Sequence, residues 1–114
     1  MTQLKTELIS QNAITELGFA DVDVGAAMNG LRPIFEFMMW NFVILAFDKI
    51  VKNTDKTLSQ SVRQFSCPIV FRGPSGGAAG QLSQQHSQNF ESWMANIPEL
   101  KVISDLDPAD SKGL

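Results

Sequence analysis

Apolar runs alternate with polar stretches along this chain, and three of the runs predict buried strands. Residues 31–38 (LRPIFEFM) and 67–73 (CPIVFRG) are rich in Ile, Val and Phe, which fit a pleated, buried surface. Pro33 lies near the beginning of the first run, where a strand tolerates proline. We expect 67–73 to be an interior parallel strand, and LKVIS at 100–104 to be a further strand.

Helical patterns fill the segments around the first runs. Residues 18–30 are rich in small side chains and end at Asn29-Gly30, which predicts a closely packed helix with a glycine stop. Residues 41–56 begin apolar on all sides and then become amphipathic. We therefore expect a helix that is buried in its first half and more exposed in its second.

Two more helices are expected in the second half of the chain. In the segment SQNFESWMAN, Phe90, Trp93 and Met94 have the i, i+3, i+4 spacing of one buried helix face. Further on, Asp107 suits an N-cap and Pro108 suits the first helical position, so a helix should begin there.

The order of these elements predicts an α/β fold. Residues 1–13 show no clear period and are read as a frayed helix, and the polar segment 58–66 is read as a loop. Alternating helices and strands are typical of a parallel sheet flanked by helices. Ligands of such sheets bind beyond the carboxyl ends of the strands. Residues 37–41 and 72–80 are therefore expected to form one rim.

Composition narrows the class of protein without indicating a function. Of the 114 residues, 44% are hydrophobic and 18% charged, as in a globular domain, and the net charge of -3 offers no basic surface for nucleic acid. The longest apolar run, residues 42–47, is too short to cross a membrane, and residues 1–13 lack a secretory signal. Cys67 is the only cysteine, so no intrachain disulfide can form and a reducing compartment is expected.

Three features of the second half could carry chemistry. The glycine-rich segment 73–80 lacks the lysine of a P-loop and does not fit the dinucleotide-binding glycine pattern, so it reads as an ordinary loop. His86, the only histidine, suits either a structural or solvated position or a catalytic role. Cys67 could pair with it as a nucleophile, but a thiol that opens a buried strand is more often inert. One histidine and one cysteine cannot hold zinc.

Two features of the first half also allow two interpretations. Glu16 precedes the small-residue helix and either stabilises the helix N-terminus or is a buried acid that shares a proton with a ligand nitrogen. The aromatic cluster at the end of the first strand indicates core packing, or a ring that stacks on a flat heterocycle. Its members are Phe35, Phe37, Trp40 and Phe42.

Seven segments of the chain together resemble one known family. ITELGFA, VGAAMNGLRPI, EFMMWNF, CPIVFRGPSGGAAGQ, QHSQNFESW, IPELKVI and DSKGL stand in the order found in beta subunits of the pyruvate dehydrogenase component of 2-oxo acid dehydrogenase complexes. The resemblance implies part of a transketolase-like pyrimidine-binding domain over residues 14–114, after a divergent N-terminal segment 1–13. EFM..NF and FRGP.G favour pyruvate enzymes over branched-chain keto acid enzymes.

The resemblance implies a thiamine diphosphate site between an alpha and a beta subunit of a heterotetramer. Glu16 stands at the family's glutamate that contacts the aminopyrimidine ring nitrogen, where a shared proton activates the cofactor. Phe42 stands at the phenylalanine that stacks on the pyrimidine ring. His86 stands at the histidine that lines the entrance channel and helps transfer the acetyl group to the lipoyl arm.

The same resemblance implies further cofactors and partners. The alpha subunit would hold the diphosphate and its magnesium, which leaves the glycine-rich segment to bring His86 to the rim. Ile69 stands at the first backbone-carbonyl ligand of a structural potassium site. Pyruvate would be the substrate, and the lipoyl-bearing acetyltransferase core would be a partner. The expected location is the cytoplasm of a bacterium or the mitochondrial matrix of a eukaryote.

The chain also departs from the family pattern. Family beta subunits are much longer, so we expect a truncated domain that has no activity alone. The alternative is a non-catalytic remnant, or a module that docks on an alpha subunit without activity. Val62 and Arg63 replace a usual Gly-Gly. Charged residues occupy positions that are normally packed or apolar, where burial is costly: Asp21, Asp23, Lys52 and Asp55.

Overall fold

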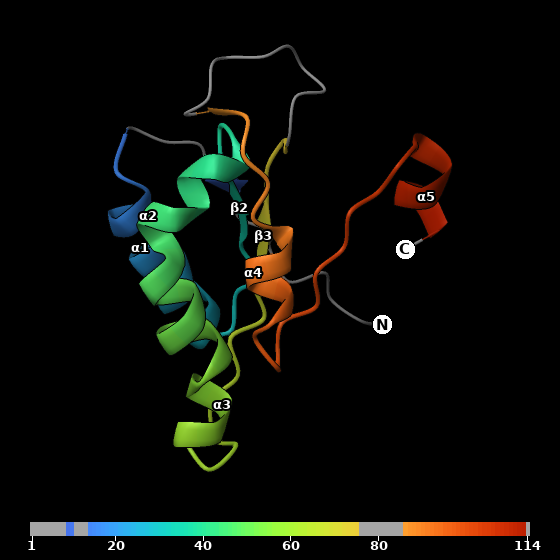
Figure 1. Ribbon diagram of the computed structural model, residues 1–114. Helices are drawn as coiled ribbons and strands as arrows, with labels where there is room; N and C mark the ends of the chain where they lie inside the picture. Colours follow the sequence, from blue (N-terminus) through green and yellow to red (C-terminus); the bar gives the residue numbers. More distant parts are fainter. Residues whose placement is uncertain (1–8, 11–13, 76–85, 114) are drawn as a thin grey trace.

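A computed structural model describes residues 9–10, 14–75 and 86–113 (Figure 1). The elements in chain order are β1 (Ile9–Ser10), α1 (Glu16–Met28), β2 (Ile34–Glu36), the 3₁₀ turn η1 (Trp40–Phe42), α2 (Val43–Asp48), the π-helical segment η2 (Lys49–Asp55), α3 (Thr57–Gln60), β3 (Val70–Arg72), α4 (Glu91–Ala95) and α5 (Pro108–Gly113). No helix in these ranges is both long and apolar enough to span a bilayer.

The three strands form one parallel sheet in the order β1-β2-β3. Ile34 of β2 is in register with Ile9 of β1 and with Val70 of β3. The expected α/β class with a parallel sheet is therefore confirmed. The frayed helix expected over residues 1–13 is wrong at Ile9–Ser10, where the backbone pairs with β2 and gains hydrogen bonds that no local pattern announces.

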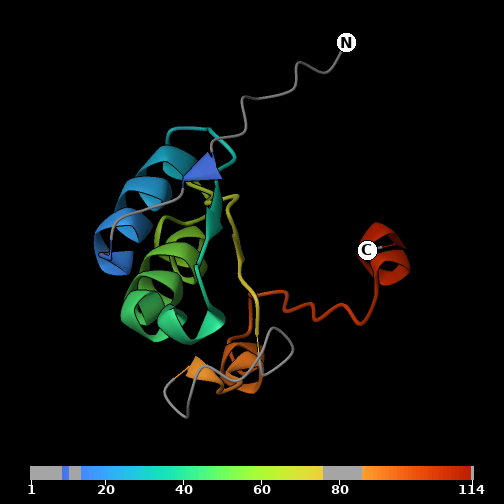
Figure 2. The ribbon, with the colours of Figure 1, turned by 90° about the horizontal axis from the view of Figure 1, so that it is seen from above.

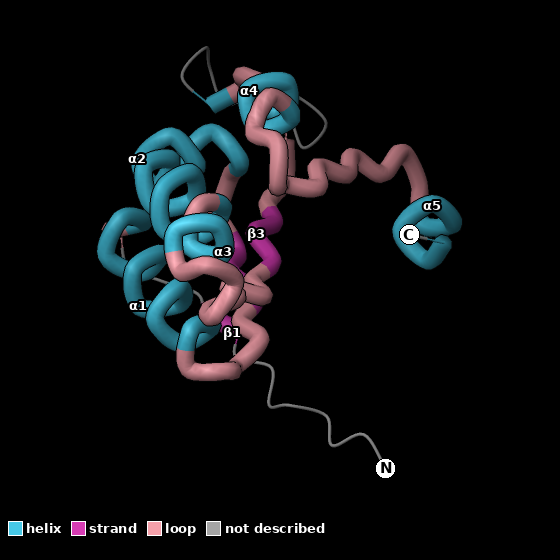
Figure 3. Tube along the Cα trace, turned by 90° about the horizontal axis from the view of Figure 1, so that it is seen from below, coloured by secondary structure: helices cyan, strands magenta, loops and turns pink. Residues whose placement is uncertain are grey.

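Helices α1 and α2 lie side by side on one face of the sheet, as Figures 1 and 2 show from two directions. Helix α4 lies beyond β3, on the side away from β1 (Figure 3). The core between sheet and helices is built from Phe35 and Phe37 of the β2 segment, with Val43 and Ala46 of α2 and Met94 of α4. Among the described elements, the opposite face of the sheet carries no packed helix.

The spacing of small and apolar residues explains the position of α1. Ala20, Val24 and Ala27 recur at helical intervals and are almost fully buried, so the helix can approach the sheet closely. Asn29 follows the last turn, and its backbone N–H donates to the carbonyl oxygen of Gly25 at 3.2 Å. The small-residue helix expected over residues 18–30 is thus confirmed, with its beginning two residues earlier at Glu16.

Two interpretations of the strands are wrong. Residues 100–104 form an extended segment without strand pairing, and β3 is consequently an edge strand of the described sheet rather than an interior one. Val70 is 54% exposed because it points to the face that has no packed helix. Apolar character alone cannot supply the neighbouring strand that an interior position needs.

Helix α4 is shorter than its apolar spacing predicts, and its buried face is narrower. Met94 is buried, but Trp93 is 54% exposed. The Trp93 ring instead packs against Phe90, with centroids 5.0 Å apart and planes at 61°. The prediction that Trp93 faces the core is therefore wrong, because a helix of five residues buries little more than one turn.

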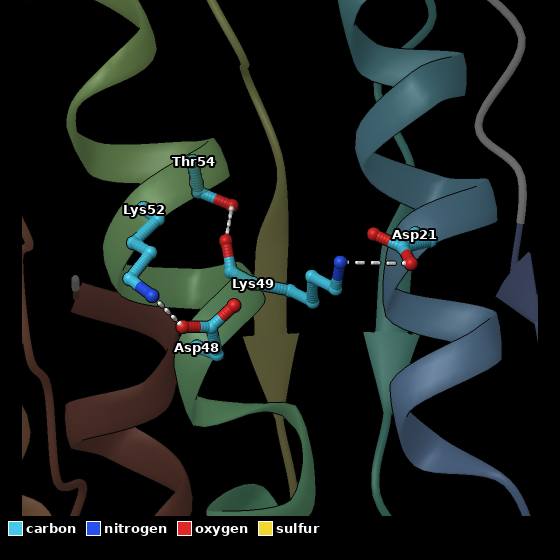
Figure 4. Close-up of polar contacts among 5 residues, drawn as sticks. All are labelled: Asp21, Asp48, Lys49, Lys52 and Thr54. Atoms are coloured by element: carbon cyan, nitrogen blue, oxygen red, sulfur yellow. Dashed lines mark hydrogen bonds and ion pairs between the residues drawn. The ribbon is translucent and has the colours of Figure 1, made fainter.

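The four unusual charges have different environments. Asp21 on α1 is half exposed and its Oδ2 lies 3.1 Å from Lys49 Nζ on η2, while Lys52 pairs with Asp48 at the surface (Figure 4). Asp23 and Asp55, in contrast, are buried. The cost expected for a buried charge therefore applies to Asp23 and Asp55, whereas Asp21 and Lys52 avoid it because their side chains reach the surface.

A left-handed turn follows α3. Val62 and Arg63 have φ angles of 52° and 64°, the region that β-carbons disfavour and glycine adopts readily. Arg63 N–H donates to the carbonyl oxygen of Leu58 at 2.8 Å, which closes the end of α3. The backbone therefore adopts, at both positions, a conformation that glycine favours.

Candidate functional site

Parallel pairing brings three segments to the carboxyl edge of the sheet. Helix α1 follows β1, η1 follows β2, and Gly73 to Ser75 follow β3. The amide N–H of Trp40 in η1 donates to the carbonyl oxygen of Pro74 at 2.8 Å, so two of the segments are joined directly. This edge is the upper end of the sheet in Figure 1. Of the residues singled out from sequence, it carries Glu16 at the start of α1 and Phe42 in η1.

Phe42 and His86 are in contact at this edge. Their ring centroids are 5.4 Å apart and the planes meet at 69°, an edge-to-face arrangement. His86 is half-buried, and its Nδ1 is a buried atom that has no hydrogen-bond partner among the described residues. The imidazole is thus held by ring packing while one of its nitrogens stays available.

Glu16 is the first residue of α1, and its side chain is partly buried. Its Oε2 has no hydrogen-bond partner within the described ranges although it is shielded from water. A carboxylate at a helix N-terminus is stabilised by the helix dipole, which accounts for the residue's place but leaves the buried oxygen without a donor. A ligand nitrogen that carries or shares a proton would satisfy it.

The other members of the aromatic cluster are core residues. Phe35 and Phe37 are each 1% exposed, with ring centroids 4.4 Å apart, and Phe71 packs on both. Trp40 meets Phe37 edge-on at 5.6 Å. The core interpretation therefore holds for Phe35 and Phe37, and Phe42 is the ring of this group that reaches the histidine.

Asn41 is a member of this edge that sequence reasoning missed. It is 7% exposed, and its Nδ2 donates to the backbone carbonyl oxygen of Gln88 at 3.1 Å and to Gln88 Oε1 at 2.9 Å. An asparagine inside the aromatic and apolar segment MMWNFV is the one signal that could have indicated it, since buried amides need partners.

Ile69 lies apart from these residues. It precedes β3 and is therefore at the amino end of the strand, where its N–H donates to the carbonyl oxygen of Cys67 at 2.9 Å. Within the described ranges, no three His, Cys, Asp or Glu side chains are grouped so as to hold a metal ion. Of the glycine-rich segment, Gly73 to Ser75 lie at the carboxyl edge, and residues 76–80 lie outside the described residues.

The Cys67 thiol has an inert environment. Burial raises the pKa of Cys67, and a hydrogen bond with Thr54 only partly opposes the effect. Its Sγ also lies 3.9 Å from the carbonyl oxygen of Val24, as the donor of a weak hydrogen bond. Cys67 is at the end of the sheet opposite His86, so a nucleophilic Cys–His pair is excluded by position.

A groove of about 900 Å³ runs between β3 and residues 99–105, and residues of η2 and α4 also line it. Glu16, Phe42 and His86 do not line it. Its apolar lining includes Val70, Leu100 and Val102. The groove reaches the carboxyl edge at Trp40 and at Gly73 to Ser75, but it does not contain the three predicted site residues.

The comparisons with known proteins agree on one family. A family model described as "Transketolase, pyrimidine binding domain" matches residues 5–114. The chain is 52% identical over 101 residues to the mitochondrial "Pyruvate dehydrogenase E1 component subunit beta" of Drosophila melanogaster, which covers 89% of this chain and 27% of the fly protein. It is 55% identical over 101 residues to the protein of that name from Rhizobium meliloti, covering 89% of this chain and 22% of the relative.

A third relative aligns with the whole chain. The "Pyruvate dehydrogenase E1 component subunit beta" of Rickettsia conorii is 48% identical over 114 residues, which are 100% of this chain and 35% of the relative. The chain thus spans between 22% and 35% of the length of these three relatives.

Proposed function

Because the chain belongs to the transketolase pyrimidine-binding domain family, we propose that it supplies the pyrimidine-binding part of a thiamine diphosphate site in a pyruvate dehydrogenase beta subunit. The observation that carries the proposal is the buried Oε2 of Glu16 at the carboxyl edge of the sheet, which has no hydrogen-bond partner among the described residues. The Phe42–His86 ring pair lies at the same edge. An acid, a flat ring and an imidazole together suit an aminopyrimidine.

Each residue has a distinct role in the proposal. Glu16 holds a proton in common with a ring nitrogen of the pyrimidine and so fixes the orientation of that ring. Phe42 offers an aromatic surface for stacking. When bound, thiamine diphosphate supplies the carbanion chemistry that decarboxylation of a 2-oxo acid requires.

His86 has the third role. Its Nδ1, which no other described residue bonds, can accept or donate a proton at the edge of the site. We assign to it the handling of a proton while an acetyl group passes to a lipoyl arm. Its contact with Phe42 keeps the imidazole beside the ring on which the pyrimidine would stack.

The relatives' name, "E1 component subunit beta", supports an alpha subunit as the proposed partner. The family resemblance further suggests that this alpha subunit would hold the diphosphate and its magnesium, and that a lipoyl-bearing acetyltransferase core would be a second partner. Pyruvate would be the substrate. The backbone carbonyl of Ile69 is proposed as one ligand of a structural potassium ion, at the end of β3 far from Glu16.

Cofactor binding tests the proposal. The full chain, alone and mixed with the alpha subunit of a relative, is titrated with thiamine diphosphate while tryptophan fluorescence is followed. Trp40 reports on the site because it lies in the same turn as Phe42. Glu16→Gln should weaken binding at least tenfold, because the amide cannot share a proton in the same way. Glu99→Gln, the same change at an exposed position, should leave binding unchanged.

Two outcomes contradict the proposal. One is equal affinity of the wild-type chain and Glu16→Gln. The other is binding to the alpha subunit without any response to thiamine diphosphate, which would favour a docking module that has no role in the cofactor site.

A further inference from the structure

We propose that Asn41 is a positioning residue that holds residues 86–88, the His86 segment, against η1. The inference rests on the proposed function, because it assigns a purpose to the placement of His86. It starts from the two hydrogen bonds from Asn41 Nδ2 to Gln88, at 3.1 Å and 2.9 Å. Both acceptors belong to a single residue far along the chain from Asn41.

Burial makes these hydrogen bonds obligatory. Asn41 is 7% exposed, so water cannot replace Gln88 as the acceptor, and loss of both bonds would leave a buried amide unsatisfied. Gln88 is itself exposed. The interaction therefore anchors the backbone of the segment at Gln88 to the core of the domain.

Asn41 and Phe42 act on this segment at two points. Phe42 packs on the His86 ring, and Asn41 holds the backbone two residues later. Both belong to η1, which Trp40 N–H fastens to Pro74 at 2.8 Å. Two attachments from one rigid turn define the direction of the imidazole as well as its position, as a proton-transferring group requires.

An asparagine with a purely structural role makes a local hydrogen bond, unlike Asn41. Asn96, the C-cap of α4, also donates its Nδ2 to a backbone carbonyl, that of Ser92 at 3.0 Å, but this bond is local to the end of α4 and exposed. It orients no distant side chain. Asn96→Asp is therefore the matched control for Asn41→Asp, since each change removes an amide donor while keeping the size of the side chain.

The first experiment uses proton NMR on the full chain, where His86 is the only histidine and its ring signals are unambiguous. In the wild-type chain we expect cross-peaks between His86 and Phe42 and a ring-current displacement of the His86 signals. In Asn41→Asp the cross-peaks should weaken several-fold and the signals should move toward those of free histidine. Gln88→Ala, which removes one acceptor from an exposed residue, should give an intermediate loss.

A control variant and the methyl signals of the core separate loss of His86 positioning from loss of the fold. Asn96→Asp should change nothing at His86. If Asn41→Asp loses its dispersed methyl signals and is unfolded, Gln88→Ala carries the test alone. Unchanged His86–Phe42 cross-peaks in Gln88→Ala and in a folded Asn41→Asp overturn the proposal, as does a wild-type chain without these cross-peaks.

The second experiment separates this proposal from the proposed function. In a complex with an alpha subunit, Asn41→Asp should slow acetyl transfer to a lipoyl domain by about tenfold or more, with thiamine diphosphate affinity within about twofold of wild type. A wild-type chain that binds no thiamine diphosphate refutes the function but leaves the NMR result standing. A normal transfer rate in Asn41→Asp refutes the positioning role.

Discussion

Gly73 lies so close to Phe37 that a side chain at position 73 would require the neighbouring atoms to shift. A β-carbon added to Gly73 would lie 3.1 Å from both the Cβ and the carbonyl oxygen of Phe37, and 3.4 Å from the backbone nitrogen of Trp40. This contact joins the ends of β2 and β3 at the carboxyl edge, just before η1. The spacing of the two strand ends therefore depends on a glycine.

Gly73→Ala should lower the free energy of unfolding by about 1–3 kcal/mol, because the new methyl group has to displace backbone atoms. Gly25→Ala is the matched control. Gly25 lies inside α1 and has open space around its Cα, so alanine there should stabilise the domain by about 1 kcal/mol through helix propensity. Urea denaturation measures both, and a Gly73→Ala variant as stable as wild type would contradict the close contact.

Val62→Gly and Arg63→Gly should each raise the free energy of unfolding by about 1 kcal/mol. The backbone at both positions is left-handed, with φ of 52° and 64°, where a β-carbon costs energy that glycine does not. Gln64→Gly is the control, since Gln64 is not among the described residues with positive φ and should only lose stability. Thermal unfolding followed by circular dichroism should show a higher midpoint temperature for Val62→Gly and Arg63→Gly and a lower one for Gln64→Gly.

Asp55→Ala should stabilise the domain by about 1–2 kcal/mol. Asp55 is 7% exposed, and its Oδ1 has no hydrogen-bond partner among the described residues, so the carboxylate is desolvated without full compensation. Asp48→Ala, at an exposed position that pairs only with surface lysine, should leave stability nearly unchanged. Equal loss of stability in both variants would show that Asp55 has a compensating partner.

The Cys67 thiol should react slowly with iodoacetamide in the folded chain. Burial raises the pKa of Cys67, so at pH 8 less thiolate is present than in the unfolded chain. The protonated thiol favours the folded state at neutral pH, and this contribution is lost as the pH rises through the raised pKa. The ratio of alkylation rates, unfolded over folded, should therefore fall between pH 8 and pH 10. A ratio of one at pH 8 would contradict the prediction.

Local signals in the sequence were sufficient for much of the fold. The stop at Asn29-Gly30 and the small residues before it predicted α1. The cap at Asp107 is confirmed in detail, since its Oδ1 accepts hydrogen bonds from Ala109 N–H at 2.7 Å and Asp110 N–H at 3.0 Å. Both features involve residues within a few positions of each other, where side-chain chemistry decides the conformation.

Pairing across the sheet could not be predicted in the same way. Residues 100–104 have the composition of a strand, yet they leave β3 unpaired on that side, because a strand needs a neighbour as well as apolar residues. The role of Asn41 could not be predicted either, because it depends on a contact with the distant Gln88 that no local sequence pattern indicates.

The candidate site, too, could be predicted from sequence only in part. The rule for parallel sheets predicted that residues after β2 and β3 share one edge, and the Trp40–Pro74 hydrogen bond confirms it. The contact between Phe42 and His86 emerged only in three dimensions. The roles of Glu16, Phe42 and His86 toward a cofactor came from family resemblance and stay predictions.

Helix α5 has no buried residue, and only the extended segment 101–107 links it to the rest of the described chain (Figures 1 and 3). Six residues are too few for a helix to persist in water without packing. Its amide protons should therefore exchange with solvent through local fraying, at rates that are insensitive to mutations in the core. Slow exchange in this helix would be a direct sign that another molecular surface has come to cover it.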